Sequence, residues 1–132
     1  MKLSNILFFV AIAGIVLFIV RSMLVGQKIA PKDALARIEA GNSVLIDVRE
    51  PSEWADGVVK GALLLPLSDL RGPRKQWADA LKKNVGKELL LYCRSGGRSG
   101  IASAILEKEG FKTVNAGGFT GWAASEAVIV KP

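Results

Sequence analysis

The chain has 132 residues, half of them hydrophobic, and a formal net charge of +6, a length that suits one modest hydrophobic core. It contains one cysteine and no histidine, which excludes an internal disulfide, a CxxC redox pair, a Cys–His nucleophile pair and the usual zinc sites, so we expect no metal and no cofactor. The charge is too mild and too dispersed for a nucleic-acid binder, and it suits a small anionic substrate better.

The first segment of the chain is apolar and uncharged over Ile6–Val20. Counted from Leu3, it would form roughly 27 Å of helix, close to the ~30 Å thickness of the hydrocarbon layer of a membrane. A cleaved signal peptide is the alternative, but no A-x-A cleavage site follows the apolar run. We therefore predict a transmembrane anchor at residues 1–26, with lipid contact through residues 3–25, followed by a linker at residues 27–30.

The charges on the two sides of this span predict its orientation. Arg21, Lys28, Lys32 and Arg37 follow it, whereas only Lys2 and the terminal amine precede it. Positive charges next to a span favour the cytoplasmic side of the membrane. We therefore expect a single-pass membrane protein with its C-terminal domain in the cytoplasm; an exported or periplasmic domain is the alternative.

The remaining residues, 31–132, alternate between helix-like and strand-like patterns, and proline and glycine mark most of the boundaries. This alternation predicts an α/β fold with an open parallel sheet that is covered on both faces. In chain order, the predicted elements are a helix over 31–40, a strand over 43–48, a short turn over 52–54 capped by Ser52, a strand over 61–65, a helix over 73–85, a strand over 88–93, a helix over 99–109, a strand over 111–118, a helix over 119–127, and residues 128–130 returning to the sheet.

Two of these helices have a predicted buried face. Trp77 and Leu81 are expected to point inward from the helix over 73–85. The apolar face of the helix over 99–109 is expected to contain Ile101, Ala104 and Ile105.

The single cysteine, Cys93, stands at the carboxyl end of a predicted central strand, shortly before a helix begins. Ligands bind at this edge of open α/β sheets. Glycines in the loop allow backbone N–H groups to converge, the helix adds the positive end of its dipole, and Arg94 and Arg98 add charges. These groups favour a thiolate, so we predict a reactive thiol that solvent can reach. The alternative is a small buried hydrophobic residue, which a lone cysteine often is.

Four motifs, in their order along the chain, resemble those of a single-domain rhodanese. Residues Asp47–Trp54 resemble the family segment D-x-R-x-x-x-E-[FYW], and residues 60–70 resemble its G-A-x-x-[IL]-P stretch. Cys93–Arg98 fits the pattern C-R-x-G-x-R in full, and Gly117–Trp122 resembles the terminal G-G-x-x-x-W.

The resemblance spans about residues 30 to 127 and implies a rhodanese-like fold for the domain at 31–132. One position departs from it. The chain has Val58 where the family often has histidine, and this leaves the chemistry of substrate access open.

The resemblance implies a sulfurtransferase. The Cys93 thiolate would take a sulfane sulfur from a donor such as thiosulfate, form a persulfide, and pass the sulfur to cyanide or to a thiol, in two half-reactions. The implied partners are a small anionic sulfur donor and a thiol or protein acceptor. Backbone amides of residues 94–99 would hold the persulfide, and Arg94 and Arg98 would orient the donor or brace the loop. The implied binding residues are Arg94, Ser95, Gly96, Gly97, Arg98 and Ser99.

Supporting roles are expected for Asp47 and Arg49, which have two interpretations. They form a buried ion pair with neighbours such as Glu53 and brace the loop from behind, or they contact substrate. We favour the ion pair, because charges at strand ends are commonly paired. Trp54 and Trp122 are expected to pack in the core, and Gly117–Gly118 to form a tight turn.

Two other functions remain as alternatives. One is a phosphatase-like or arsenate-reductase-like activity, although the loop of those enzymes is longer than Arg94–Gly97. The other is a membrane-tethered binding module that is non-catalytic or uses its thiol as a sensor. A set of basic residues would then contact anionic lipid headgroups, or would simply form a solvated helix face: Arg71, Arg74, Lys75, Lys82, Lys83 and Lys87.

Overall fold

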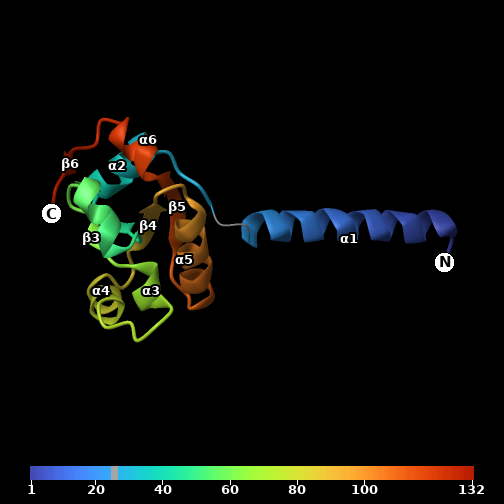
Figure 1. Cartoon of the computed structure of the whole chain (residues 1–132). Coiled ribbons are helices and arrows are strands. Elements are labelled where there is room, and N and C mark those ends of the chain that lie inside the picture. Colours follow the sequence, from blue (N-terminus) through green and yellow to red (C-terminus); the bar gives the residue numbers. More distant parts are fainter. Residues whose placement is uncertain (25–26) are drawn as a thin grey trace.

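The computed structural model describes residues 1–24 and 27–132, and its first element is a long helix, α1 (Leu3–Leu24). Figure 1 shows α1 set apart from the folded domain, and none of the side chains over Leu3–Val20 is buried. Within the described residues, this helix is long and apolar enough to cross a membrane. The end of the predicted anchor, residues 25–26, lies outside the described part of the chain.

The central sheet of the domain is parallel throughout, as the sequence predicts. Its four strands lie in the order β3–β1–β4–β5. Strand β4 is buried at all of its residues, because it has neighbours on both sides and helices on both faces. The strands are β1 (Ser43–Asp47), β3 (Leu63–Leu64), β4 (Glu88–Cys93) and β5 (Thr113–Gly118).

Alternate side chains of β4 supply two separate cores. Leu89, Leu91 and Cys93 belong to one hydrophobic cluster, whereas Leu90 and Tyr92 belong to the other. This is the alternation expected of a strand whose two faces are both covered. The helices over the Cys93 face are α3 (Leu67–Leu70), α4 (Trp77–Lys83) and α5 (Gly97–Lys108), and those over the Tyr92 face are α2 (Pro31–Glu39) and α6 (Phe119–Ala123).

The C-terminal strand does not return to the main sheet, so that prediction is wrong. Strand β6 (Ile129–Val130) pairs antiparallel with β2 (Val58–Val59) in a separate two-stranded sheet. Val58, which replaces the histidine common in the family, is buried in this small sheet.

The helix predicted over 73–85 is shorter than expected and begins only at Trp77. Arg74 interrupts it with a positive φ of 54°, a conformation that a helix does not contain. Asp69 accepts hydrogen bonds from the backbone N–H groups of Lys75, Gln76 and Trp77 at 3.0–3.1 Å and so fixes the start of α4. Trp77 is fully buried and Leu81 is half-buried, as predicted.

Helix α5 turns a different face to the sheet from the one predicted. Ile101 is 40% exposed and Ala104 is also exposed, while Ile105 is only partly buried. The buried face consists of smaller residues together with one leucine, and small polar side chains give no apolar signal in the sequence. Its residues are Ser99, Ala102, Ser103 and Leu106.

The predicted turn after β1 is a 3-10 helix, η1 (Pro51–Asp56). Its cap is Glu50 rather than Ser52, since the Glu50 and Glu53 side chains form a reciprocal capping box. The Glu50 carboxylate therefore caps the N-terminus of η1, the role that we expected of the Ser52 hydroxyl. Trp54 lies half-buried within this element.

The segment predicted as a linker at 27–30 is attached to the sheet. Lys28 forms a parallel bridge with Asn115 of β5. The Ile29 N–H donates to the Asn115 carbonyl at 3.0 Å, and the Asn115 N–H donates to the Gln27 carbonyl at 2.8 Å. The chain that follows α1 thus occupies the free edge of β5.

Candidate active site

Cys93 is the last residue of β4, and it lies opposite Gly118 at the end of β5. A short loop, Arg94–Gly96, connects it to α5, whose first residue is Gly97. Gly96 caps this helix with a φ of 92°, a left-handed conformation that favours glycine. The sequence thus folds locally into a strand, a tight loop and a helix whose N-terminus starts beside the sulfur.

Two groups of the loop and helix point at the Cys93 sulfur. The Gly96 N–H donates to Sγ at 3.0 Å, and the Ser99 Oγ lies 3.5 Å from Sγ. Burial alone raises the pKa of the Cys93 thiol, but hydrogen bonds from Ser99 and from the amides of Ser95 and Gly96 outweigh it, so the pKa lies below its usual value. The direction agrees with the predicted thiolate, and the hydrogen bonds are its main cause.

The Cys93 side chain is completely buried, with 0% of its surface exposed. The sequence predicts a thiol that solvent can reach, so this prediction is wrong for the conformation described. Sγ lies in the hydrophobic cluster between the sheet and α5 on one side and is covered by its own loop on the other. A donor molecule can reach the sulfur only if this loop moves.

The loop rests directly on the end of β5 at Gly118. A Cβ atom at this position would lie 2.6 Å from the Arg94 carbonyl oxygen and 3.1 Å from the Ser95 Cα. Only glycine permits this close approach of two backbones. Gly117 and Gly118 are therefore the last residues of a strand, and not the tight turn that we predicted.

Asn115 is a residue of the site that the sequence does not reveal. Its Nδ2 donates to the Gly96 carbonyl at 2.9 Å, and its Oδ1 accepts from the Ser99 hydroxyl at 2.8 Å and from the Gly117 N–H at 3.1 Å. A polar residue in the middle of a short strand carries no signal of this arrangement. It becomes visible only when β5 and the Cys93 loop are seen side by side.

The two arginines of the loop differ in their partners. Arg98 forms a two-point ion pair with Glu53 of η1, with its Nη2 atom 2.7 Å from Oε2. The pKa of Glu53 is lowered to about 2, chiefly by this hydrogen bond. Arg94 is exposed and has no ion pair with any residue of 1–24 or 27–132. Arg98 thus holds the start of α5 against η1, and Arg94 is the loop arginine whose charge is unpaired among the described residues.

Asp47 and Arg49 form a buried ion pair, as we favoured, but they pair with each other and not with the carboxylate of Glu53, which pairs with Arg98. The Arg49 Nη2 atom lies 2.8 Å from the Asp47 Oδ2, and the two side chains are 3% and 0% exposed. Arg49 also donates to the carbonyls of Glu53 and Gly57 at 3.2 and 2.7 Å, and its guanidinium lies over the Phe119 ring. The pair therefore fixes the segment that carries Glu53, which in turn holds Arg98 of α5.

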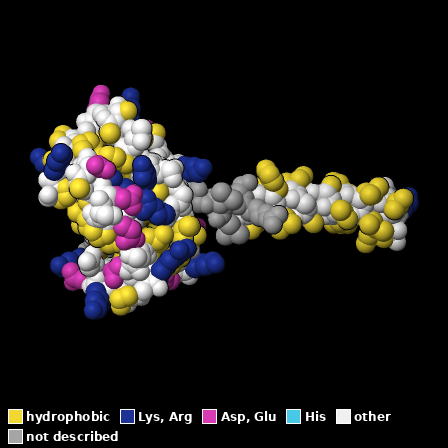
Figure 2. All heavy atoms as spheres, viewed as in Figure 1, with side chains coloured by type: hydrophobic (Ala, Val, Ile, Leu, Met, Phe, Trp, Pro, Cys, Tyr) yellow, Lys and Arg dark blue, Asp and Glu magenta, His cyan; other side chains and the backbone are white. Residues whose placement is uncertain are grey.

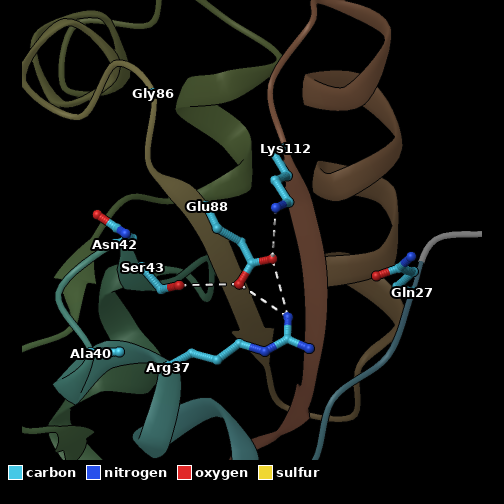
Figure 3. Close-up of a pocket in the computed structure, with 8 residues that line it drawn as sticks. All are labelled: Gln27, Arg37, Ala40, Asn42, Ser43, Gly86, Glu88 and Lys112. Atoms are coloured by element: carbon cyan, nitrogen blue, oxygen red, sulfur yellow. Dashed lines mark hydrogen bonds and ion pairs between the residues drawn. The ribbon is translucent and has the colours of Figure 1, made fainter.

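A cavity of about 690 Å³ lies away from this site, at the amino-terminal edge of the sheet (Figure 3). Glu88 lies in it, and both oxygens of its carboxylate accept from Arg37 Nη1 at 3.1 Å. The Ser43 hydroxyl donates to one of them at 3.1 Å, and the Lys112 Nζ lies 4.0 Å from the other. The carboxylate is thus already engaged by Arg37 and by the Ser43 hydroxyl, so this cavity is a poor candidate for chemistry.

Charges of both signs are mixed on the face of the domain seen in Figure 2. Among the basic residues that we considered for lipid contact, Arg74 pairs with Glu109 and Lys83 pairs with Asp79. This pattern favours a solvated surface over a basic patch.

Comparisons with known proteins agree with this geometry. The profile of the rhodanese-like domain matches residues 30–125. An uncharacterised Bacillus subtilis protein, YqhL, is 32% identical over 124 residues, which make up 91% of this chain and 94% of that protein. An Allochromatium vinosum protein named sulfurtransferase is 35% identical over 91 residues, covering 67% of this chain and 79% of its own. A solved structure, a rhodanese-related protein from Thermoplasma volcanium, superposes with a TM-score of 0.66 at 27% identity, covering 80% of this chain and 99% of that one.

Proposed function

The chain belongs to the rhodanese-like domain family, and we propose that it is a sulfurtransferase that carries sulfur on Cys93. Relatives named sulfurtransferases support the general activity. The observation that carries the proposal for this residue is the direction of the loop hydrogen bonds, because the Gly96 N–H points at Sγ from 3.0 Å. A backbone amide aimed at a sulfur favours its charged form, whether that form is a thiolate or a persulfide.

The reaction proceeds in two half-reactions. The Cys93 thiolate attacks the outer sulfur of thiosulfate, a new S–S bond forms, and the S–S bond of the donor breaks with its electron pair leaving on sulfite. Cyanide or a thiolate acceptor then attacks the outer sulfur of the persulfide, and the electron pair of the broken S–S bond returns to Cys93. No net oxidant or reductant is needed, and the enzyme alternates between two covalent forms.

The residues around Cys93 divide the remaining tasks. Backbone amides of the loop and of the first turn of α5 stabilise the negative charge of the persulfide. These amides belong to Arg94, Ser95, Gly96, Gly97, Arg98 and Ser99. Arg94, whose charge is unpaired, attracts the anionic donor. Arg98 is engaged by Glu53 and keeps the start of α5 in place. Asp47 and Arg49 brace the segment behind it.

The burial of Cys93 adds a conformational step. We propose that Arg94–Gly96 swings away from Sγ when the donor binds and closes again over the persulfide. Arg94 and Ser95 are exposed, so their side chains do not oppose this movement. Closure shelters the persulfide from water between the two half-reactions.

The N-terminal helix supports a proposal about where this chemistry takes place. We propose that residues 3–25 span a lipid bilayer once, with the domain on the cytoplasmic side. The 18-residue window Leu3–Val20 has a mean hydropathy of 2.7, and positive charges lie mainly on the domain side. Protease protection in vesicles of known orientation tests the sidedness; digestion from the outer face of right-side-out vesicles would place the domain outside.

Intact mass measurement tests the proposed activity. The full chain in detergent is incubated with thiosulfate and then with cyanide. We expect a gain of one sulfur atom that cyanide removes, and no gain in Cys93→Ala. Ser103→Ala is the matched control, because Ser103 is buried in α5, the helix that follows the Cys93 loop, and its hydroxyl has no partner among the described residues. This variant should gain sulfur like the unmodified chain.

The complete burial of Cys93 favours a second candidate function, a membrane-tethered, non-catalytic module that binds a partner. Such a module needs no access to its thiol. It predicts no gain of sulfur from thiosulfate or from other sulfane donors. The same mass experiment therefore separates the two functions.

A further inference from the structure

Asn115 concentrates its side-chain contacts on the groups that surround Cys93. It lies in β5 and is 8% exposed. Its three side-chain hydrogen bonds go to Gly96, Ser99 and Gly117, at 2.9, 2.8 and 3.1 Å. Because the carbonyl of Gly96 can only accept and the amide of Gly117 can only donate, these partners fix which end of the Asn115 amide is oxygen. Its orientation is therefore determined on both sides.

Gly96 is held at both of its backbone polar groups. Its carbonyl accepts from Asn115, and its N–H donates to the Cys93 Sγ. Glycine adopts its φ of 92° and many other conformations readily, so the backbone alone does not fix this orientation and the two contacts must do so. The Asn115 side chain thus maintains the direction of the N–H group that faces the sulfur.

Ser99 connects Asn115 to the sulfur by a second route. Its hydroxyl has one hydrogen, and two acceptors lie within reach, Asn115 Oδ1 at 2.8 Å and Cys93 Sγ at 3.5 Å. Rotation of the Ser99 hydroxyl can redirect its hydrogen bond from the amide oxygen of Asn115 to a charged Cys93 sulfur. Asn115 Oδ1 is not left unsatisfied by that rotation, since the Gly117 N–H still donates to it.

We propose that Asn115 is a positioning residue for Cys93, which aims the Gly96 N–H at the sulfur and holds the Ser99 hydroxyl ready to turn toward it. This inference deepens the proposed function and rests on it in one respect, that Cys93 is the reacting group. Asn115 touches no reacting atom itself. It acts through Gly96 and Ser99.

The segment that follows α1 holds the same residue from the opposite side. The backbone of Asn115 is bonded to Gln27 and Ile29, which lie along the edge of β5. A cavity of about 360 Å³, lined by this segment, by Asn115 and by the loop at Ser95 and Gly96, lies next to these contacts. The segment therefore completes the support of Asn115, and loss of the Ile29 N–H should weaken it.

The test is the rate of Cys93 alkylation by iodoacetamide as a function of pH, on the full chain in detergent. Since the chain has one cysteine, the signal comes from this thiol alone. The midpoint of the profile reports the pKa, and the plateau at high pH reports how often the loop opens. In Asn115→Leu we expect the midpoint to rise by about one pH unit, which is a tenfold loss of thiolate at pH values well below both midpoints. We also expect the plateau to rise several-fold.

Three further variants sharpen this test. Asn84→Ala removes an asparagine that donates to a helix carbonyl of α4 at 2.8 Å, away from Cys93, and should leave both readouts unchanged. Ile29→Pro should raise the midpoint by a smaller amount than Asn115→Leu. If Asn115→Leu does not fold, Asn115→Asp replaces it, because aspartate has nearly the same side-chain volume as asparagine. It removes the donor to the Gly96 carbonyl and adds a negative charge, and both changes raise the midpoint of Cys93 alkylation.

An unchanged midpoint and plateau in a folded Asn115 variant would overturn the inference, and a lower melting temperature alone would make Asn115 merely structural. An unchanged midpoint in Ile29→Pro would limit the positioning role to the side chain. Alkylation needs no sulfur donor. A chain that takes no sulfur from thiosulfate can therefore still show the shift, and failure of the proposed function remains distinguishable from failure of this inference.

Discussion

The two edges of the parallel sheet use charged and polar groups in opposite ways. At the amino-terminal edge, Glu88 is saturated by Arg37, Ser43 and Lys112 beside a cavity of about 690 Å³. At the carboxyl-terminal edge, hydrogen-bond donors converge on the sulfur of Cys93, whose side chain is completely buried. The difference shows that cavity volume and converging donors point to different edges of the sheet, and only the carboxyl-terminal edge combines such donors with the thiol that the proposed function uses.

Substitutions at the two edges should separate activity from stability, and this is the largest effect we expect. Cys93→Ala should abolish sulfur transfer and leave folding almost unchanged. Arg37→Ala should leave transfer intact but destabilise the fold by about 1–3 kcal/mol, because the buried Glu88 carboxylate loses its main donor. Transfer assays and chemical unfolding measure the two effects. Loss of transfer in a folded Arg37→Ala chain would break the distinction.

Gly118→Ala should disturb the carboxyl-terminal edge next most strongly. Its Cβ would lie 2.6 Å from the Arg94 carbonyl oxygen, so we expect destabilisation of about 1–3 kcal/mol and a fall in transfer rate of roughly tenfold or more as the loop is displaced. The matched control is Gly121→Ala, where a Cβ meets nothing within 4 Å. Equal rates in the two variants would show that the loop position is unimportant.

Replacement of Arg94 should have a smaller effect, on donor binding alone. The side chain is exposed and carries the unpaired charge of the loop. Arg94→Gln should raise the KM for thiosulfate by roughly three- to tenfold, and added salt should reduce the difference. Steady-state kinetics at two ionic strengths measure this. A fall in kcat with unchanged KM would instead assign Arg94 to the chemical step.

The ion pair between Glu53 and Arg98 should give the smallest effect, a dependence of stability on acid pH. The pKa of Glu53 is lowered from 4.5 to about 2 in the folded chain. Its contribution is therefore complete above pH 4.5 and is lost as the pH falls toward 2. Unfolding free energies of the unmodified chain and of Glu53→Gln should converge over this interval. A constant difference would mean that the pair does not stabilise the fold.

The local patterns of the sequence predict the parallel sheet well. The uninterrupted apolar run of β4 and the glycine and proline boundaries are local signals, and Cys93 stands where the end of such a strand places it. The two-residue strands β2 and β6 have no periodic signal, so their pairing could not be predicted. The inner face of α5 was missed because Ser99, Ala102 and Ser103 are small.

Only the part of the candidate site that is continuous in the sequence could be predicted. Cys93 and its loop are contiguous in the sequence, whereas the groups that hold them come from other elements. Glu53, which is 45 residues from Arg98, is the partner that makes Arg98 a brace of the loop, one of the two roles that we expected for this arginine. Asn115 meets Gly96 only because β5 lies beside β4. Such contacts depend on the tertiary fold, and no local pattern in the sequence indicates them.

The most direct test of the account is an ultraviolet absorbance titration of the single thiolate on the full chain. This measurement needs no reagent to enter the buried site, and the difference spectrum against Cys93→Ala isolates the one sulfur. The account predicts a midpoint below the value of roughly 8.5 for a free cysteine, because the amide of Gly96 and its neighbours favour the charged form. A midpoint at or above that value would contradict it.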